Sequence, residues 1–214
     1  MDEYIFSKNT IEFVTVGVEF CAFMEKVSET EKKDFIDTSI KILPLLYLKA
    51  TLLPDKKEND EYDTDIEHFV NEEIYEYIRN SIERLLGEQD SYLEVFQADM
   101  QYSETPIISS ISENMSDIYQ DIKDFVSIYS LGNEECMRTA LNECKDNFIN
   151  YWGQRLVNVL RALHTLRYSQ EEIDDENIHE WHKAKSTEKN NLFTRRQESW
   201  KEDVNMDEWD KWNE

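Results

Sequence analysis

The chain has 214 residues, of which 40% are hydrophobic and 12% aromatic, and this excludes a wholly disordered protein. Its 47 acidic and 23 basic residues give a net charge of −24, which repels phosphate backbones and anionic lipid and argues against nucleic-acid and membrane partners. The 4 Gly and 3 Pro are too few for the many tight turns of a β-rich chain, so composition favours an all-α fold.

The first predicted helix spans residues 9–28, "NTIEFVTVGVEFCAFMEKVS". Asn9 or Thr10 is expected to cap its amino terminus. Apolar residues recur at helical spacing and predict the buried stripe of this helix. That stripe consists of Ile11, Val14, Val18, Cys21 and Met24.

The second predicted helix begins near Glu31 and ends at Pro54, with Pro44 in its interior. A proline there removes one backbone hydrogen bond and costs a straight helix about 3 kcal/mol. Either the helix bends at Pro44 or a new helix begins there. Leucines on nearly every face offset the cost if they are buried, so the sequence predicts a kinked helix at the centre of the domain. They are Leu43, Leu45, Leu46, Leu48, Leu52 and Leu53.

Three further helices are predicted along the chain. One covers residues 66–86 and ends at Gly87, one runs from near Pro106 to about residue 131, and the longest covers residues 134–168. The whole is a bundle of five to seven helices over residues 1–169. Residues 170–214 form a separate acidic tail, partly helical or mobile, that contains four of the five tryptophans.

The first candidate site lies on the helix that is predicted to end near residue 131. Glu113, Asp117 and Asp121 share one face through their i, i+4, i+8 spacing, with Asp124 beside them. Three interpretations stay open. The carboxylates form a solvated face that could meet a basic partner, they pair with arginines of the longest helix, or they bind a divalent cation. The arginines are Arg155, Arg161 and Arg167.

The second candidate is a metal site in "ENIHEWH". Glu176, His179 and His182 follow one another at i, i+3 intervals, which places a carboxylate and two imidazoles on one side of a helix. Di-iron bundles need a Glu-x-x-His unit on each of two helices, and the only relative here is Asp65-x-x-His68. A polar helix without a metal is therefore the favoured interpretation.

Two further groups are weaker candidates. Gly153, Arg161 and His164 could line a small-molecule pocket on the longest helix, although a close helix contact at Gly153 and a packed His164 explain them as well. Met206, Trp209 and Trp212 alternate with acidic residues and could dock as an amphipathic helix into a groove.

The stretches "LPLLYLKATLLP", "ISENMSDIYQDIKDF" and "FINYWGQRLVNVLRALH" resemble the bacterial domain of unknown function 5063 family, found in Bacteroides-type bacteria. The resemblance covers residues 8–169. It implies an all-helical, intracellular bacterial protein and assigns no catalytic residue.

The expected function is that of a non-enzymatic module that binds a basic protein partner through its acidic surface, as an inhibitor or immunity protein would. The alternatives are a metal-dependent enzyme that uses the carboxylates and a helical bundle that binds a small molecule. No cofactor is expected, with a divalent cation as the exception. The amino terminus lacks the features of a secretory signal, the longest apolar run is shorter than a membrane span of roughly 20 residues, and the cysteines lack C-x-x-C spacing. These features predict a cytoplasmic protein.

Overall fold

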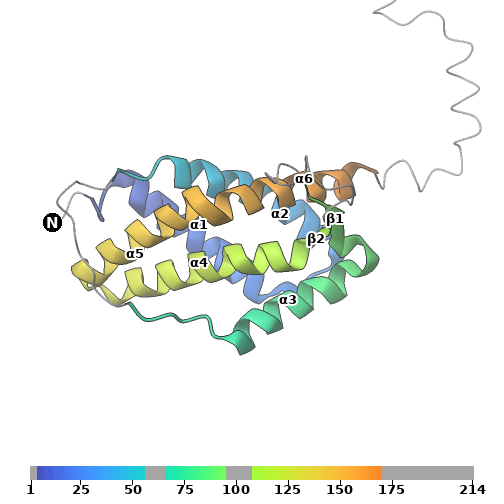
Figure 1. Cartoon of the computed structure of the whole chain (residues 1–214), viewed down its shortest axis with the longest axis horizontal. Helices are drawn as coiled ribbons and strands as arrows, with labels where there is room; N and C mark the ends of the chain where they lie inside the picture. The colour runs from blue at the N-terminus through green and yellow to red at the C-terminus, as the bar shows by residue number, and fades with distance from the viewer. Residues whose placement is uncertain (1–3, 56–65, 95–107, 170–214) are drawn as a thin grey trace, which may run out of the picture. The chain divides into compact units, whose positions relative to one another are not determined.

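The computed structural model describes residues 4–55, 66–94 and 108–169, and within them the fold is a bundle of α-helices (Figure 1). This confirms the predicted fold class. The helices are α1 Lys8–Glu25, α2 Lys32–Thr51, α3 Glu72–Leu86, α4 Ile111–Leu131, α5 Glu134–Asn147 and α6 Gly153–Ser169. A π-helical turn, Phe148–Trp152, joins α5 to α6, so the predicted longest helix is one continuous element. All described residues except Ser169 belong to one compact unit, Met1–Tyr168, and the domain boundary at residue 169 stays a prediction.

Short 3₁₀ turns and a small hairpin complete the described part of the chain. The turns are Val27–Glu29 after α1 and Gly87–Asp90 after α3. Strand β1, Ser91–Leu93, pairs antiparallel with β2, Ile108–Ser110, with Ser91 opposite Ser110. The sequence did not predict this hairpin, because strands of three residues are too short to show an alternating pattern.

Two helices begin where a polar side chain can accept their first free N–H group. Ser7, and not Asn9 or Thr10, caps α1, since its Oγ accepts the N–H of Thr10 at 3.1 Å. Asn71 caps α3 through the N–H of Ile74. Residues 66–70 therefore lie outside the helix, whereas the sequence predicted that it begins at residue 66.

Glycine and a polar cap also set both ends of α4. Its helical residues begin after Ser110, whose Oγ accepts the N–H of Glu113 at 3.3 Å, so the predicted start near Pro106 is too early. At its other end Gly132 adopts φ 76°, a left-handed conformation that ends the helix as predicted.

The buried face of α1 is rotated from the predicted one, although Cys21 and Met24 of the predicted stripe are buried. Phe13 and Phe20 are fully buried, whereas Ile11 and Val18 are 49% and 48% exposed. Two buried phenylalanines remove more apolar area from water than the β-branched residues of the predicted stripe, and this selects their face. Gly17 lies on the same face, where a Cβ would come within 3.0 Å of the Val126 side chain of α4.

Helix α2 buries only one side, and the predicted burial on nearly all faces is wrong. Leu43 and Leu46 have no exposed surface, whereas Leu45, Leu48 and Leu52 are 43%, 52% and 43% exposed. The helix continues through Pro44, so no new helix begins there, and the bend at this residue stays a prediction. Pro44 lies on the exposed side, where water can satisfy the carbonyl that loses its helical donor.

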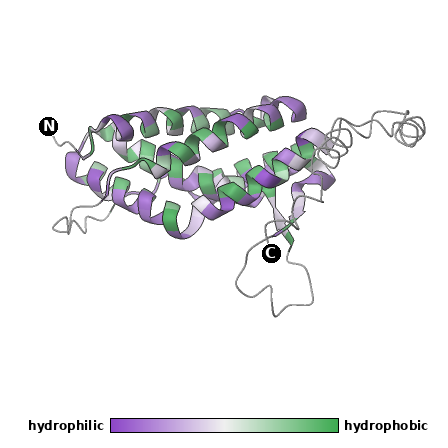
Figure 2. Ribbon diagram, turned by 90° about the horizontal axis from the view of Figure 1, so that it is seen from above, coloured by the Kyte–Doolittle hydropathy of each residue, from purple (hydrophilic) through white to green (hydrophobic). Residues whose placement is uncertain are grey.

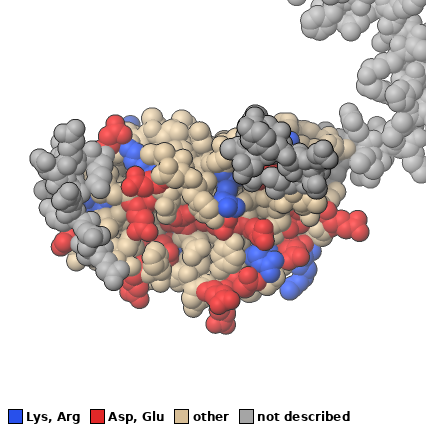
Figure 3. Space-filling view, viewed as in Figure 1, with Lys and Arg blue, Asp and Glu red and all other residues tan. Residues whose placement is uncertain are grey.

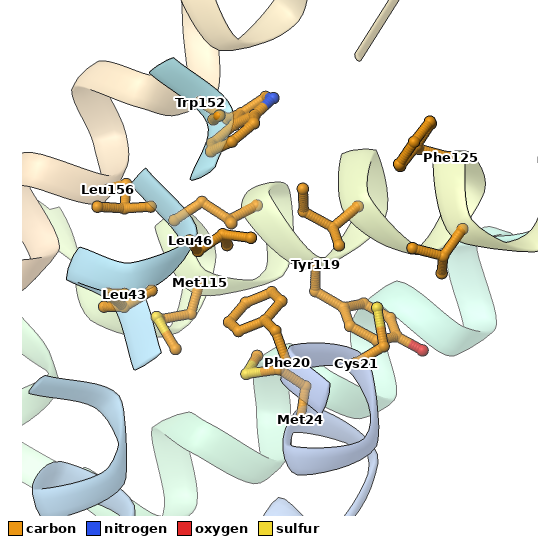
Figure 4. Close-up of a cluster of buried hydrophobic side chains, with 14 of the residues drawn as sticks. Phe20, Cys21, Met24, Leu43, Leu46, Met115, Tyr119, Phe125, Trp152 and Leu156 are labelled. Atoms are coloured by element: carbon orange, nitrogen blue, oxygen red, sulfur yellow. The ribbon is translucent and has the colours of Figure 1, made fainter. Parts of the chain in front are cut away.

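The core centres on α4. The prediction that α2 lies at the centre of the domain is wrong. Met115, Ile118 and Ile122 of α4 have no exposed surface. Figure 4 shows residues of α1, α2 and α4 meeting with Trp152 and Leu156 in one apolar cluster, and Figure 2 shows the hydrophobic residues running in stripes along the helices. Burial of most of its surface gives α4 fixed neighbours, so polar groups on its remaining face are held in defined positions.

Candidate functional site

Three carboxylates of α4 line one cavity of about 250 Å³. Asp117, Asp121 and Asp124 lie at i, i+4 and i+7, which places them on the same face of the helix. Glu113, one turn earlier, is exposed and does not line this cavity. The rest of the lining comes from the segment before α3, from α4 itself, and from α5 and the π turn. It consists of Ile66, His68, Gln120, Phe125, Ile128, Ala140, Glu143, Cys144, Asn147 and Tyr151.

Asp117 is neutralised within the domain. Its carboxylate accepts the hydroxyl of Tyr75 at 2.8 Å and that of Tyr151 at 3.1 Å, and it forms an ion pair with Arg155 at 2.9 Å. Arg155 also donates to the side-chain oxygen of Asn114 at 2.7 Å and lies over the ring of Tyr151. Of the three arginines considered in the sequence, Arg155 is the one that meets this face.

The other two arginines hold different parts of the bundle. Arg161 donates to the backbone oxygen of Leu93 at 2.7 Å, and Arg167 forms an ion pair with Asp37 of α2. The predicted pairing with α4 carboxylates is therefore made by neither of these two residues.

Asp124 holds the segment that leads into α3. Its Oδ1 accepts the backbone N–H groups of Phe69 at 2.7 Å and Val70 at 3.0 Å, and its Oδ2 contacts Nδ1 of His68 at 3.0 Å. Asp124 is buried, and such a carboxylate needs donors of this kind. Its role is to fix the backbone of residues 68–70 against α4.

Asp121 lies between these two satisfied carboxylates and differs from both. It accepts one hydrogen bond, from the side-chain amide of Asn147 at 2.6 Å. The pKa of Asp121 is raised to about 6, chiefly because the side chain is buried. The Asn147 hydrogen bond opposes this rise, and the nearby carboxylates of Asp117, Asp124 and Glu143 contribute to it. Near neutral pH the cavity therefore holds an ionised carboxylate in surroundings that disfavour its charge.

Two observations on the described residues bear on nucleophilic and metal-centred chemistry. Cys144 is buried, which raises the pKa of its thiol well above the usual value, so it is not a thiolate near neutral pH. Within residues 4–55, 66–94 and 108–169, no three His, Cys, Asp or Glu side chains are arranged to hold a metal ion. All three cysteines are free thiols.

The remaining predicted site residues are not brought together. Gly153 is buried, and a Cβ there would come within 2.4 Å of the Phe148 oxygen of the same helical element. The expected close approach of another helix at Gly153 stays a prediction. His164 is exposed, with its ring centroid 4.6 Å from that of Tyr168. The metal candidates Glu176, His179 and His182 lie outside the described residues, and so do the docking candidates Met206, Trp209 and Trp212.

Several residues of the cavity were not candidates in the sequence. His68, Glu143 and Asn147 come from segments well separated from residues 117–124 along the chain. His68 was considered only with Asp65, as a weak metal-ligand pair. Nothing in a single sequence aligns these segments with α4, because their contacts depend on how α5 and residues 66–70 cross it.

Comparison with known proteins places this helical domain in a family. The family described as "Domain of unknown function (DUF5063)" matches residues 4–169, and the chain belongs to it. The chain is also similar to the crystal structure of protein BF1032 from Bacteroides fragilis, with 46% sequence identity and a TM-score of 0.68. That match covers 78% of this chain and 96% of the other. The comparison with curated proteins found no match.

In the described parts of the chain, no helix has both the length and the apolar character that crossing a bilayer requires.

Proposed function

We propose that this domain binds a basic protein partner, and that the cavity beside Asp121 receives a lysine or arginine side chain of that partner. The observation that carries the proposal is the half-buried carboxylate of Asp121, which has neighbouring carboxylates and a single hydrogen bond, from Asn147. A cation placed beside it would stabilise the ionised form that burial disfavours.

The shape and lining of the cavity suit a long cationic side chain. Asp121 and Glu143 offer carboxylates for the charged group, while Phe125, Ile128 and Ala140 offer apolar surface for its alkyl stem. Asp117 and Asp124 already have donors, so neither has to move when a cation binds, and Asp124 adds negative potential beside Asp121.

The surroundings of the cavity favour the approach of a basic partner. Figure 3 shows acidic side chains in a band across this face, over α4. A net charge of −24 on the whole chain also accelerates association with a cationic protein at low ionic strength.

The test is binding of a fluorescent lysine- and arginine-rich peptide to the full chain, measured by anisotropy at low and high salt. The double substitution Asp121→Asn and Glu143→Gln is expected to weaken binding by about 10-fold or more. Glu113→Gln removes one charge, against two in the double variant, from the same helix outside the cavity, and this control is expected to change binding less than about 2-fold.

The peptide result decides between specific recognition and general attraction. Equal losses in the double variant and the Glu113→Gln control would contradict the cavity. A complete lack of peptide binding at low salt would contradict the function itself. Capture from a host lysate with the wild-type chain and the double variant would then identify partners that depend on the cavity.

A further inference from the structure

The solvent-facing side of α2 carries an apolar stripe that no described residue covers. Leu45, Leu48 and Leu52 follow one another at spacings of three and four residues, and Pro44 is exposed beside them. This spacing is the one that lines the contact between two paired helices. Leu46 and Leu43 already supply the core contact of α2, so the stripe is a second apolar face of the same helix.

This face is also the least acidic part of a strongly acidic chain. No Asp or Glu occurs between Asp37 and Asp55, nor from Asn147 to Ser169. The two stretches pack together, since the rings of Tyr47 and Phe148 are 5.2 Å apart. Asp37 at the edge is already paired with Arg167. A second copy can approach here with less carboxylate repulsion than over α4.

We propose that α2 is the contact of a symmetric homodimer in which the α2 helices of two copies pair antiparallel. A two-fold axis at Leu48 places Leu52 opposite Pro44 of the second copy and Lys41 opposite Asp55 of the second copy. Lys41 is exposed and forms no ion pair among the described residues. Asp55 pairs with Lys145 at 2.8 Å, yet its side chain is fully exposed and can accept a second cation. The face therefore sets apolar residues against apolar residues and Lys41 against Asp55, as a two-fold contact requires.

The first experiment measures the mass of the full chain by sedimentation equilibrium over about two decades of concentration. The wild type is expected to change from monomer to dimer with concentration. Leu48→Asp brings two carboxylates together on the axis and is expected to weaken the dimer about 100-fold or more. Circular dichroism of both proteins shows that this variant keeps its helices, since Leu48 is half exposed.

The matched control is Val18→Asp on α1. Val18 has nearly the same exposure as Leu48, 48% against 52%. Glu12 and Phe23 of α1 contact Lys49 and Phe35 of α2. Val18 lies six residues after Glu12 and five before Phe23, which places it on a different face of α1. Val18→Asp is expected to leave the dimer within about 2-fold of wild type.

A charge exchange tests the register. Lys41→Asp is expected to weaken the dimer about 10-fold, because each of two symmetric pairs becomes repulsive, and adding Asp55→Lys is expected to restore it. A wild type that is monomeric at every concentration would overturn the proposal, as would a dimer unaffected by Leu48→Asp. A double variant no tighter than Lys41→Asp alone would overturn this antiparallel pairing. The peptide assay of the acidic cavity uses a different face, so its failure leaves these measurements unaffected.

Discussion

Arg155 of α6 forms an ion pair with Asp117 of α4, with 2.9 Å between its Nη1 and the Asp117 Oδ2. The Asp117 side chain is 13% exposed and that of Arg155 is 36% exposed, so the pair lies partly out of water. Two tyrosine hydroxyls complete the shell of the carboxylate. The pair therefore links α4 to the middle of the longest helical element described, residues 134–169, and fixes Asp117 in the wall of the cavity.

Replacing Arg155 with Met keeps an apolar stem but removes the cation. We expect a loss of about 1–2 kcal/mol in the free energy of unfolding, because Asp117 keeps its charge without a cationic partner. Urea denaturation of Arg155→Met, Asp117→Asn and the double variant forms a double-mutant cycle, with an expected coupling of about 1 kcal/mol. Losses that simply add would show that the contact contributes nothing to stability.

Replacing Asp124 with Ala removes the acceptor for two backbone N–H groups at residues 69 and 70. We expect a loss of about 2–3 kcal/mol, because the amide of Val70 is left buried without a partner. Amide hydrogen exchange at Phe69 and Val70 should accelerate more than at α6. Ser130→Ala, at an exposed position of the same helix, is the control and should leave both rates unchanged. Unaltered exchange at these two residues in Asp124→Ala would contradict the anchoring role.

The sequence predicted the helices well and the buried faces of α1 and α2 poorly. The α5–α6 element was predicted within about one residue at each end. Its apolar residues recur at helical spacing over many turns, and Gly132 with Asn133 marks its start. The orientation of α2 could not be predicted, since leucines on every side leave no polar face to define which side meets water. The cost of Pro44 inside a helix suggested that burial of the surrounding leucines offsets it, whereas Pro44 lies on the exposed side of α2.

The sequence predicted which carboxylates share a face of α4, but not what each of them contacts. Helical spacing alone is enough to place Asp117, Asp121 and Asp124 on one face. Their individual environments depend on which segments cross α4, and one sequence does not contain that information. Arg155 was one of three arginines considered, and only the crossing of α6 over α4 selects it.

Replacing Gly153 even with alanine should destabilise the domain. Its N–H donates to the Phe148 oxygen in the π turn, and a Cβ would lie 2.4 Å from that oxygen and 2.9 Å from the Phe148 ring. We expect Gly153→Ala to cost about 2–4 kcal/mol despite the better helix propensity of alanine. Thr165→Ala, at an exposed position in α6, should change stability by less than about 0.5 kcal/mol. Thermal unfolding of both variants measures the contrast, and a neutral Gly153→Ala would mean that the turn relaxes.

Asp121 should make the stability of the domain depend on pH. Its pKa rises to about 6 in the folded chain from roughly 3.9 in the unfolded chain, so folding takes up a proton between these values. The stabilising contribution of this proton is complete below about pH 4 and is lost as the pH rises through about 6. Above that pH the ionised carboxylate of Asp121 destabilises the folded state.

Asp121→Asn removes the destabilising charge and keeps an oxygen that can accept a hydrogen bond from the Asn147 amide. We expect the variant to match wild type near pH 4 and to exceed it by about 2 kcal/mol at pH 7.5, measured by urea denaturation across this range. Glu113→Gln, at an exposed position, should show no such trend. A stability difference for Asp121→Asn that is the same at pH 5 and pH 7.5 would contradict the raised pKa. A variant that is more stable yet binds the basic peptide less would separate loss of recognition from loss of folding.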